Sequence, residues 1–138
     1  QYLEFKDSVF VLDDSYNSNP SSFEQGLQTF LHLTEGLKRI VVAGDMLDLG
    51  KSTSKAHKRA LNLLQVSDLD QIFLIGSAFQ TALEQNTQKD TRFKYFSSIN
   101  ELKQEIESQV DSYQAYFIKG SRAMGLEGCV EALRKIKK

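Results

Sequence analysis

Eight consecutive residues near the start of the chain, Asp13 to Pro20, concentrate side chains that can bind a ligand. They read Asp-Asp-Ser-Tyr-Asn-Ser-Asn-Pro and supply two carboxylates, a phenol and two amides. Such groups hydrogen-bond to hydroxyls, and a phenol ring can also pack on a planar ligand. The same residue types are ordinary in turns. Composition alone therefore leaves both a binding loop and a plain turn open for this segment.

A second cluster, Lys119-Gly120-Ser121-Arg122, places two cations in a short loop. If a helix follows, its first backbone N–H groups add to the positive charge of Lys119 and Arg122. This arrangement predicts a carboxylate or phosphate site, in which Arg122 can form two parallel hydrogen bonds. The alternative is a solvated loop in which Arg122 pairs with Asp45 or Glu127.

A third cluster, Gly44-Asp45-Met46-Leu47-Asp48-Leu49-Gly50-Lys51-Ser52, ends like a phosphate-binding P-loop. A P-loop has four residues between its glycines, whereas this segment has five. Asp45 and Asp48 would also repel a phosphate, which needs N–H donors and positive charge. We therefore exclude a P-loop and interpret both aspartates as groups that orient an arginine or an ammonium. His57, on the helix predicted next, is a weaker site candidate, because a lone helix histidine is usually a packing residue.

The segments that carry these clusters alternate between predicted strands and helices. Apolar runs predict buried strands at 9–12, 40–43, 72–75, 93–96 and 115–118, and alternation at 3–6 predicts a half-exposed edge strand. Helical spacing of apolar residues predicts helices at about 54–65, 76–83, 98–110 and 124–136. A first helix is predicted to begin near Ser21, because Ser21 and Glu24 have the spacing of a capping box, and Asn19-Pro20 is predicted to lead into it.

This alternation predicts a Rossmann-like α/β domain with three layers, a mostly parallel sheet of about six strands and an antiparallel edge strand. Each of the three clusters follows a strand, and open α/β sheets bind ligands at the carboxyl ends of their strands. The first strand is not followed by Gly-x-Gly-x-x-Gly, so the sequence lacks the usual dinucleotide-binding fingerprint.

Composition limits the remaining function classes. The 138 residues are predicted to form one domain, and the net charge of −1 does not indicate a nucleic acid or an anionic membrane as partner. The single cysteine, Cys129, excludes an internal disulfide, suits a reducing compartment such as the cytoplasm, and is predicted to lie in the core. No apolar run has transmembrane length, and no His/Cys cluster has the spacing of metal ligands. Because the chain opens in strand-like sequence, we expect it to be part of a longer protein.

Together the three clusters resemble a known family. Residues 13–20 resemble the signature that opens the C-terminal domain of the Mur ligases, specifically those that add D-alanyl-D-alanine. Residues 44–50 resemble the family's Gly-Asp-Met-Leu-Glu-Leu-Gly loop, with Asp48 in place of the glutamate, and residues 119–122 resemble its Lys-Gly-Ser-Arg loop. The resemblance covers essentially the whole chain, but only the last third of such a ligase.

The resemblance implies a part in ATP-dependent amide formation during peptidoglycan precursor synthesis. An acyl phosphate would form on UDP-N-acetylmuramoyl-tripeptide, and the amine of D-alanyl-D-alanine would attack it. In the family the P-loop and the Mg²⁺ ligands belong to a central ATPase domain, which this chain lacks together with the N-terminal domain. The chain is therefore expected to be inactive alone, and to close on the central domain over ATP while presenting the dipeptide.

The resemblance also implies roles for individual residues, none of them catalytic and none a metal ligand. Nucleotide binding is implied for Asp14, which would lie on the ribose side, and for Tyr16 and Asn17. Substrate binding is implied for Asn19, Asp45, Asp48, Lys119, Ser121 and Arg122, with Arg122 on the dipeptide carboxylate; His57 is a possible addition.

Two alternatives stay open. One is another Mur-type ligase, such as a relative of folylpolyglutamate synthetase, although those relatives usually place a histidine where this chain has Tyr16-Asn17-Ser18-Asn19-Pro20. The other is an α/β binding module without catalysis.

Overall fold

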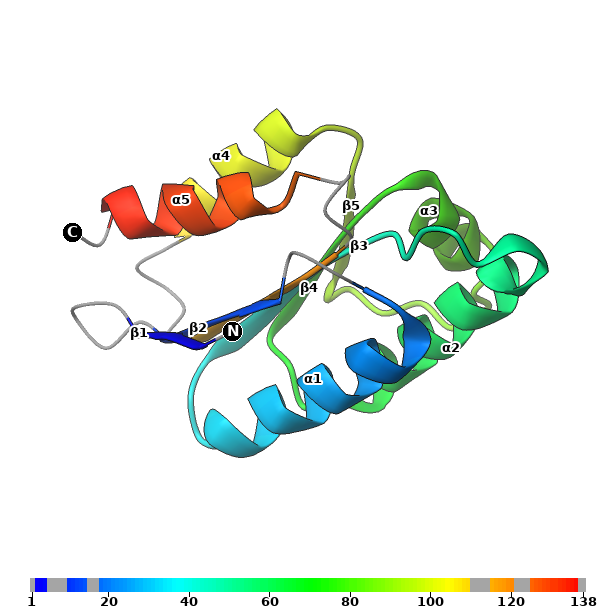
Figure 1. The fold of residues 1–138 in the computed structure, drawn as a ribbon, viewed down its shortest axis with the longest axis horizontal. Coiled ribbons are helices and arrows are strands. Elements are labelled where there is room, and N and C mark those ends of the chain that lie inside the picture. The colour runs from blue at the N-terminus through cyan, green and yellow to red at the C-terminus, as the bar shows by residue number, and fades with distance from the viewer. Residues whose placement is uncertain (1, 5–9, 15–17, 110–114, 121–124, 137–138) are drawn as a thin grey trace.

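The computed structural model describes residues 2–4, 10–14, 18–109, 115–120 and 125–136. Strands and helices alternate over most of this length (Figure 1). The strands are β1 (Tyr2–Glu4), β2 (Phe10–Asp14), β3 (Arg39–Gly44), β4 (Gln71–Ile75), β5 (Phe93–Phe96) and β6 (Ala115–Lys119). The helices are α1 (Pro20–Leu33), the 3₁₀ turn η2 (Gly50–Ser52), α2 (Thr53–Val66), α3 (Ser77–Glu84), α4 (Ile99–Gln109) and α5 (Glu127–Ile136).

The strands form one sheet in the order β1-β2-β6-β3-β4-β5. β1 pairs with β2 in the antiparallel direction, and every other neighbouring pair in the sheet is parallel. Parallel neighbours need long crossover connections, and helices supply them here. Because β6 lies between β2 and β3, the last strand in the sequence occupies the middle of the sheet.

Helices cover both faces of the sheet and create two separate cores. α1, α2 and α3 lie on one face, and α4 and α5 lie on the other (Figure 1). In β3, Val41 and Ala43 face the first core while Ile40 and Val42 face the second, as the two-residue period of a strand requires. The unbroken apolar run that predicted this strand is thus buried on both sides. The prediction of a three-layer α/β domain with a mostly parallel sheet is confirmed.

The second core contains the cysteine of the chain. Cys129 is fully buried in α5, together with Val130 and Leu133, as its place in an apolar helical pattern predicted. The first core is built around aromatic rings: Phe30 stacks on Phe117 at 5.4 Å between centroids, and Phe23 tilts against the same ring at 6.5 Å. None of the helices in the described ranges is long and apolar enough to cross a membrane.

Two predicted boundaries were wrong. The first helix is capped by Asn19 and not by Ser21: the Asn19 side chain accepts a hydrogen bond from the Ser22 N–H at 2.9 Å, and Ser22 Oγ accepts one from the Asn19 N–H at 3.1 Å. Pro20 then occupies the first helical position, where its missing N–H costs nothing. In addition, β2 continues through Asp13 and Asp14, which the sequence had placed in the loop.

Candidate functional site

Three adjacent strands bring the three sequence clusters to one edge of the sheet. At the carboxyl end of β2, Asp14 is in register with Lys119 of β6. On its other side Lys119 is in register with Ala43 of β3, directly before the third cluster. The ends of these strands are therefore side by side, as expected for a ligand site in an open α/β sheet.

Close backbone packing holds the second and third clusters together. Lys119 is 1% exposed, and the next residue, Gly120, lies against Gly44 at the end of β3. A Cβ atom at Gly120 would come within 2.4 Å of Leu126 Cδ1 and 3.5 Å of Gly44 Cα. A side chain at position 120 would therefore require the buried Leu126 to move.

Asp45 connects the third cluster to a helix far along the chain. Its carboxylate is buried and accepts hydrogen bonds from the backbone N–H groups of Ala78 at 2.9 Å and Phe79 at 3.0 Å. These N–H groups belong to the first turn of α3, whose own N-cap residue, Gly76, has no side chain to offer. Asp45 thus caps α3 from the neighbouring strand, and its negative charge lies at the positive end of the helix dipole.

The position of the Asp45 carboxylate also explains why a glycine, Gly76, directly follows β4. Its backbone has φ +112° and ψ 149°, a region that is almost exclusive to glycine. A Cβ atom there would lie 2.3 Å from Cγ of Asp45. Gly76 was not among the site residues predicted from the sequence, although a Gly-Ser pair directly after a buried strand is a usable signal for a tight strand-to-helix turn.

His57 is fully buried beneath the third cluster, where it fixes the backbone of the loop. Its Nε2 accepts a hydrogen bond from the Met46 N–H at 3.0 Å, and its Nδ1 lies 2.6 Å from the Thr53 carbonyl oxygen. Since Nε2 is an acceptor, the proton sits on Nδ1 and the ring is neutral. The 3.9 Å contact between Nε2 and Asp45 Oδ1 is therefore not an ion pair. The ring edge also packs on Phe79 at 4.8 Å between centroids.

The tip of the third cluster faces solvent. Asp48 is exposed and has φ +62°, a left-handed conformation that aspartate tolerates better than most residues. Its neighbour Leu47 is 39% exposed, which is unusual for a large apolar side chain in this protein. Asp48 is exposed whereas Asp45 is buried, so the two aspartates that the sequence grouped lie in different environments.

The first cluster is described only in part. Asn19 is exposed, and its side-chain oxygen is used in the cap of α1. Tyr16, Asn17, Ser121 and Arg122 lie outside the described residues, and Asp14 is described by its backbone. The sequence analysis passed over Ser18, which is 4% exposed and whose hydroxyl has no hydrogen-bond partner in the described part of the molecule.

No group of three or more His, Cys, Asp or Glu side chains that could hold a metal ion occurs among the described residues. The side chains described at this edge include the amide of Asn19, the hydroxyl of Ser18, the carboxylates of Asp45 and Asp48 and the buried ammonium of Lys119. Such an edge can hold and orient a polar ligand.

Comparison with known proteins gives a consistent result. The family model for the Mur ligase, glutamate ligase domain, matches residues 1–122. The UDP-N-acetylmuramoyl-tripeptide–D-alanyl-D-alanine ligase of Treponema pallidum is 29% identical over 130 residues, which cover 93% of this chain and 28% of that protein.

Two solved structures have the same fold. MurF from Acinetobacter baumannii superposes with a TM-score of 0.84 at 26% identity, covering 98% of this chain and 30% of that one. MurF from Thermotoga maritima, solved in complex with ADP, superposes with a TM-score of 0.78 at 23% identity over 98% of this chain and 30% of that one. The chain thus spans less than a third of the length of these relatives. With the family model matched over most of its length, the chain belongs to the Mur ligase family, in which it corresponds to the glutamate ligase domain.

Proposed function

We propose that this chain is the C-terminal domain of an ATP-dependent ligase that adds D-alanyl-D-alanine to UDP-N-acetylmuramoyl-tripeptide in peptidoglycan precursor synthesis. The observation that carries the proposal is the alignment of 93% of the chain with a ligase of that name. The joint position of the three clusters at the carboxyl edge of the sheet supports it further. The N-terminal and central ATPase domains would lie outside residues 1–138, and the enzyme would work in the cytoplasm.

The domain's share of the reaction would be orientation and exclusion of water. Holding two substrates in a reactive geometry replaces a slow encounter by an intramolecular step, and closure keeps water from a reactive acyl phosphate. For the nucleotide side we propose Asp14, Tyr16 and Asn17, with the buried hydroxyl of Ser18 as a further donor. For the dipeptide side we propose Asn19, Asp48, Lys119, Ser121 and Arg122.

Asp45 and His57 enter the proposal as positioning residues. Both carboxylate oxygens of Asp45 already accept hydrogen bonds from backbone N–H groups of α3. His57 Nε2 accepts one from the Met46 N–H of the loop, and its Nδ1 contacts the Thr53 carbonyl oxygen at the start of α2. They hold the Gly44–Gly50 segment in a fixed conformation, and this segment in turn presents Leu47 and Asp48 at the edge of the sheet. Their effect on substrate binding would thus be indirect.

ATP and Mg²⁺ would be held mainly by the central domain. The described residues offer neither a P-loop nor a cluster of metal ligands, so this edge fits the sugar or base side of a nucleotide better than its phosphates. When bound, ATP supplies the phosphoryl group that activates the tripeptide. The residues of this chain would orient the nucleotide and the dipeptide from the opposite side.

The test is an NMR titration of the protein with D-alanyl-D-alanine and then with ATP and Mg²⁺. We expect shifts to cluster at residues 16–19, 44–48 and 119–122. The matched ligand is D-alanyl-D-alanine amide, which lacks the carboxylate and should bind at least tenfold more weakly, because one charge-assisted bidentate contact is lost.

The matched variants are Arg122→Gln and Arg59→Gln. The first should abolish the preference for the free carboxylate, whereas the second, on the outer face of α2, should leave it unchanged. Saturable shifts confined to other surfaces, or an equal preference in both variants, would contradict the assignment of this edge.

A further inference from the structure

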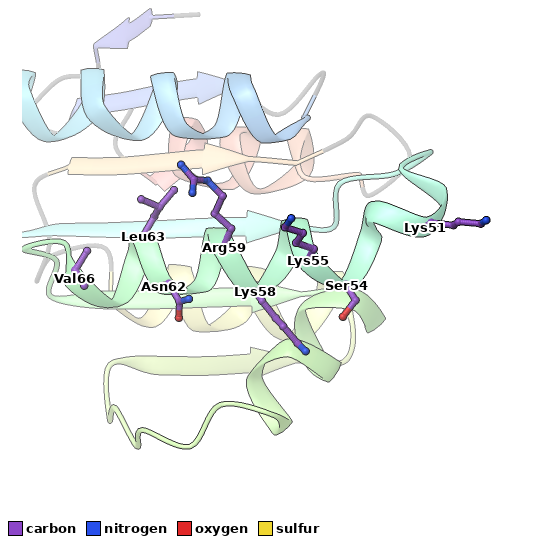
Figure 2. Close-up of a pocket in the computed structure, with 8 residues that line it drawn as sticks. All are labelled: Lys51, Ser54, Lys55, Lys58, Arg59, Asn62, Leu63 and Val66. Carbon is purple, nitrogen blue, oxygen red and sulfur yellow. The ribbon is translucent and has the colours of Figure 1, made fainter.

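One face of α2, together with the 3₁₀ turn η2 directly before it, carries a dense group of cations that the proposed ligase role does not use. Lys51, Lys55, Lys58 and Arg59 are all exposed and lie within about two helical turns. With Ser54, Asn62, Leu63 and Val66 they line a shallow groove of about 680 Å³ (Figure 2). This set of eight residues is called the α2 groove below.

The charge of the α2 groove is not balanced locally. The segment from Gly50 to Val66 contains no aspartate or glutamate. The ion pair described in the groove joins Arg59 to Glu24 of α1 at 3.2 Å, and Arg59 remains 65% exposed in it. Removing the four cations from the net charge of −1 leaves −5 for the rest of the chain, which holds the other 13 cations and all 18 acidic residues.

The positions of the lysines do not stabilise the helix. Lys55 lies in the first turn of α2 and Lys51 in η2 just before it, and the first turn of α2 has no acidic residue. The helix dipole is positive at that end, so each cation there is mildly unfavourable, by up to about 1 kcal/mol. Helix stability therefore gives no reason for these two charges, whereas a negatively charged partner would.

The shape of the α2 groove favours a helix as that partner. Lys55, Arg59 and Leu63 form one row with a spacing of four residues, and Lys58, Asn62 and Val66 form a second. Figure 2 shows Arg59 and Leu63 directed toward α1 while Lys58 and Asn62 are directed to the other side. Two such rows are the ridges between which a ridge of a second helix packs.

The two ends of the α2 groove differ in chemistry. Cations dominate from Lys51 to Arg59, while the far end presents Leu63, which is half-buried, and Val66, which is 82% exposed. From Lys51 to Val66 the groove runs roughly 22 Å along the helix. A nucleic acid has phosphates along its whole length and would place some of them on the apolar end.

We propose that the α2 groove docks an acidic amphipathic helix of a partner protein. Its carboxylates would lie against Lys51, Lys55 and Lys58, and an apolar side chain would lie on Leu63 and Val66. The charge complementarity fixes the direction of the docked helix, because reversing it places carboxylates on the apolar end.

The probe is a synthetic helical peptide of about 18 residues with glutamates along one half of a face and leucines along the other half. Binding to the protein is measured by fluorescence anisotropy at physiological salt, with a scrambled peptide of the same composition as reference. We expect the patterned peptide to bind at least tenfold more tightly than the scrambled one.

Variants then locate the site. Lys55→Glu combined with Lys58→Glu should weaken binding by tenfold or more, because like charges would face each other. Val66→Asp should weaken it about fivefold, since an apolar contact is lost. The control, Lys89→Glu combined with Lys103→Glu, makes the same change in net charge elsewhere and should leave binding unchanged. Circular dichroism shows that each variant is folded.

Several results would overturn the proposal. Equal binding of the patterned and scrambled peptides would reduce the effect to nonspecific charge attraction, as would an equal loss in the control variant. The same variants are tested with a duplex oligonucleotide and with phosphatidylserine vesicles. Tighter binding of either one than of the peptide, lost on reversal of Lys55 and Lys58, would assign the α2 groove to a nucleic acid or to a lipid surface.

Discussion

At the scale of single residues, Asp45 shows how one carboxylate can hold two segments of the site in place. Its oxygens accept hydrogen bonds from the N–H groups of Ala78 and Phe79, which have no partner within the first turn of α3. We predict that Asp45→Ala lowers the free energy of unfolding by about 2–3 kcal/mol, because a cap and a dipole contact are lost together. Urea denaturation measures the change. Asp68→Ala is the control, since that side chain is fully exposed, and a similar loss there would contradict the argument.

A second residue-scale prediction concerns the glycine beside that carboxylate. Gly76→Ala adds a Cβ atom 2.3 Å from Asp45 Cγ in addition to the backbone strain, and we expect a loss of about 3 kcal/mol or more in unfolding free energy. Gly36→Ala is the matched control, because Gly36 also has a positive φ, +84°, but has open space around it. It should cost about 1 kcal/mol.

The double variant Gly76→Ala with Asp45→Ala separates the clash from the strain. Removing the carboxylate relieves the clash, so the two changes together should cost less than the sum of the single changes. Thermal denaturation of the four proteins in this cycle is sufficient. Strict additivity would mean that Asp45 and Gly76 do not interact.

The chemistry of these residues could be predicted from the sequence, but their partners could not. A carboxylate after a buried strand indicates a site, and Asp45 does lie at the predicted edge. The N–H groups that donate hydrogen bonds to Asp45 are more than thirty positions further along the chain, and no local sequence pattern connects them to this residue. His57 is similar: its spacing predicts a helix position, while its neutral form follows from contacts with the Met46 N–H and the Thr53 carbonyl.

At the scale of elements, an arginine side chain caps the C-terminal end of α2 at the amino edge of the sheet. Arg92 donates to the carbonyl oxygens of Gln65 at 2.6 Å, Ser67 at 2.8 Å and Leu69 at 3.1 Å. A lysine ammonium at this position could not donate to all three carbonyl oxygens at once, because it lacks the planar, forked donors of a guanidinium. We predict that Arg92→Lys costs about 2–4 kcal/mol of unfolding free energy, measured by urea denaturation. Arg59→Lys, on an exposed ion pair, should change it by less than about 1 kcal/mol.

The same arginine makes this end of α2 sensitive to acid. The side-chain hydrogen bonds from Arg92 hold the pKa of Asp90 below its ordinary value of 3.8 in the folded protein. A lowered folded pKa means that the stabilisation is complete above the unfolded pKa and is lost as pH falls below it. The stability advantage of the native protein over Asp90→Asn should therefore be constant above about pH 5 and shrink as pH falls below about 4. Denaturant titrations of both proteins from pH 7 to pH 2.5 measure it, and a constant difference would contradict the role of the charge.

Strands that are buried on both faces of the sheet could be predicted from the sequence. In β3, for example, residues 40–43 form a continuous apolar run, and such runs have few alternatives in a chain of this size. The start of α1 was less well predicted, because Asn19, Ser21 and Ser22 all have capping side chains and neighbour one another. Pro20 decides between them, since it fits the first helical position and so makes the residue before it the cap.

At the scale of the whole molecule, the meeting of the three clusters at one edge of the sheet was predictable although the order of the strands was not. Three clusters that each follow a parallel strand must lie on the same edge of a sheet. That rule needs no knowledge of which strands are neighbours. The insertion of β6 between β2 and β3, which puts Lys119 beside Asp14, depends on contacts across more than a hundred residues and has no local signal.

The carboxyl edge also carries an apolar side chain that suits contact with another domain. Leu47 is 39% exposed at the tip of a loop that Asp45 and His57 hold in place, so it cannot easily turn inward. In the complete ligase that we propose, closure would bury Leu47 against the central domain. Leu47→Asp should then lower kcat/KM for D-alanyl-D-alanine about tenfold, because the closed state would bury an unpaired charge. The same substitution should leave the stability of this domain within about 0.5 kcal/mol of the original, as exposed positions usually do.

Leu33→Asp is the matched control: Leu33 is 43% exposed but ends α1 at the opposite edge of the sheet, away from the proposed contact. An equal loss of activity in both variants would place the contact with the central domain elsewhere, whereas a loss confined to Leu47→Asp would tie catalysis to closure at this edge.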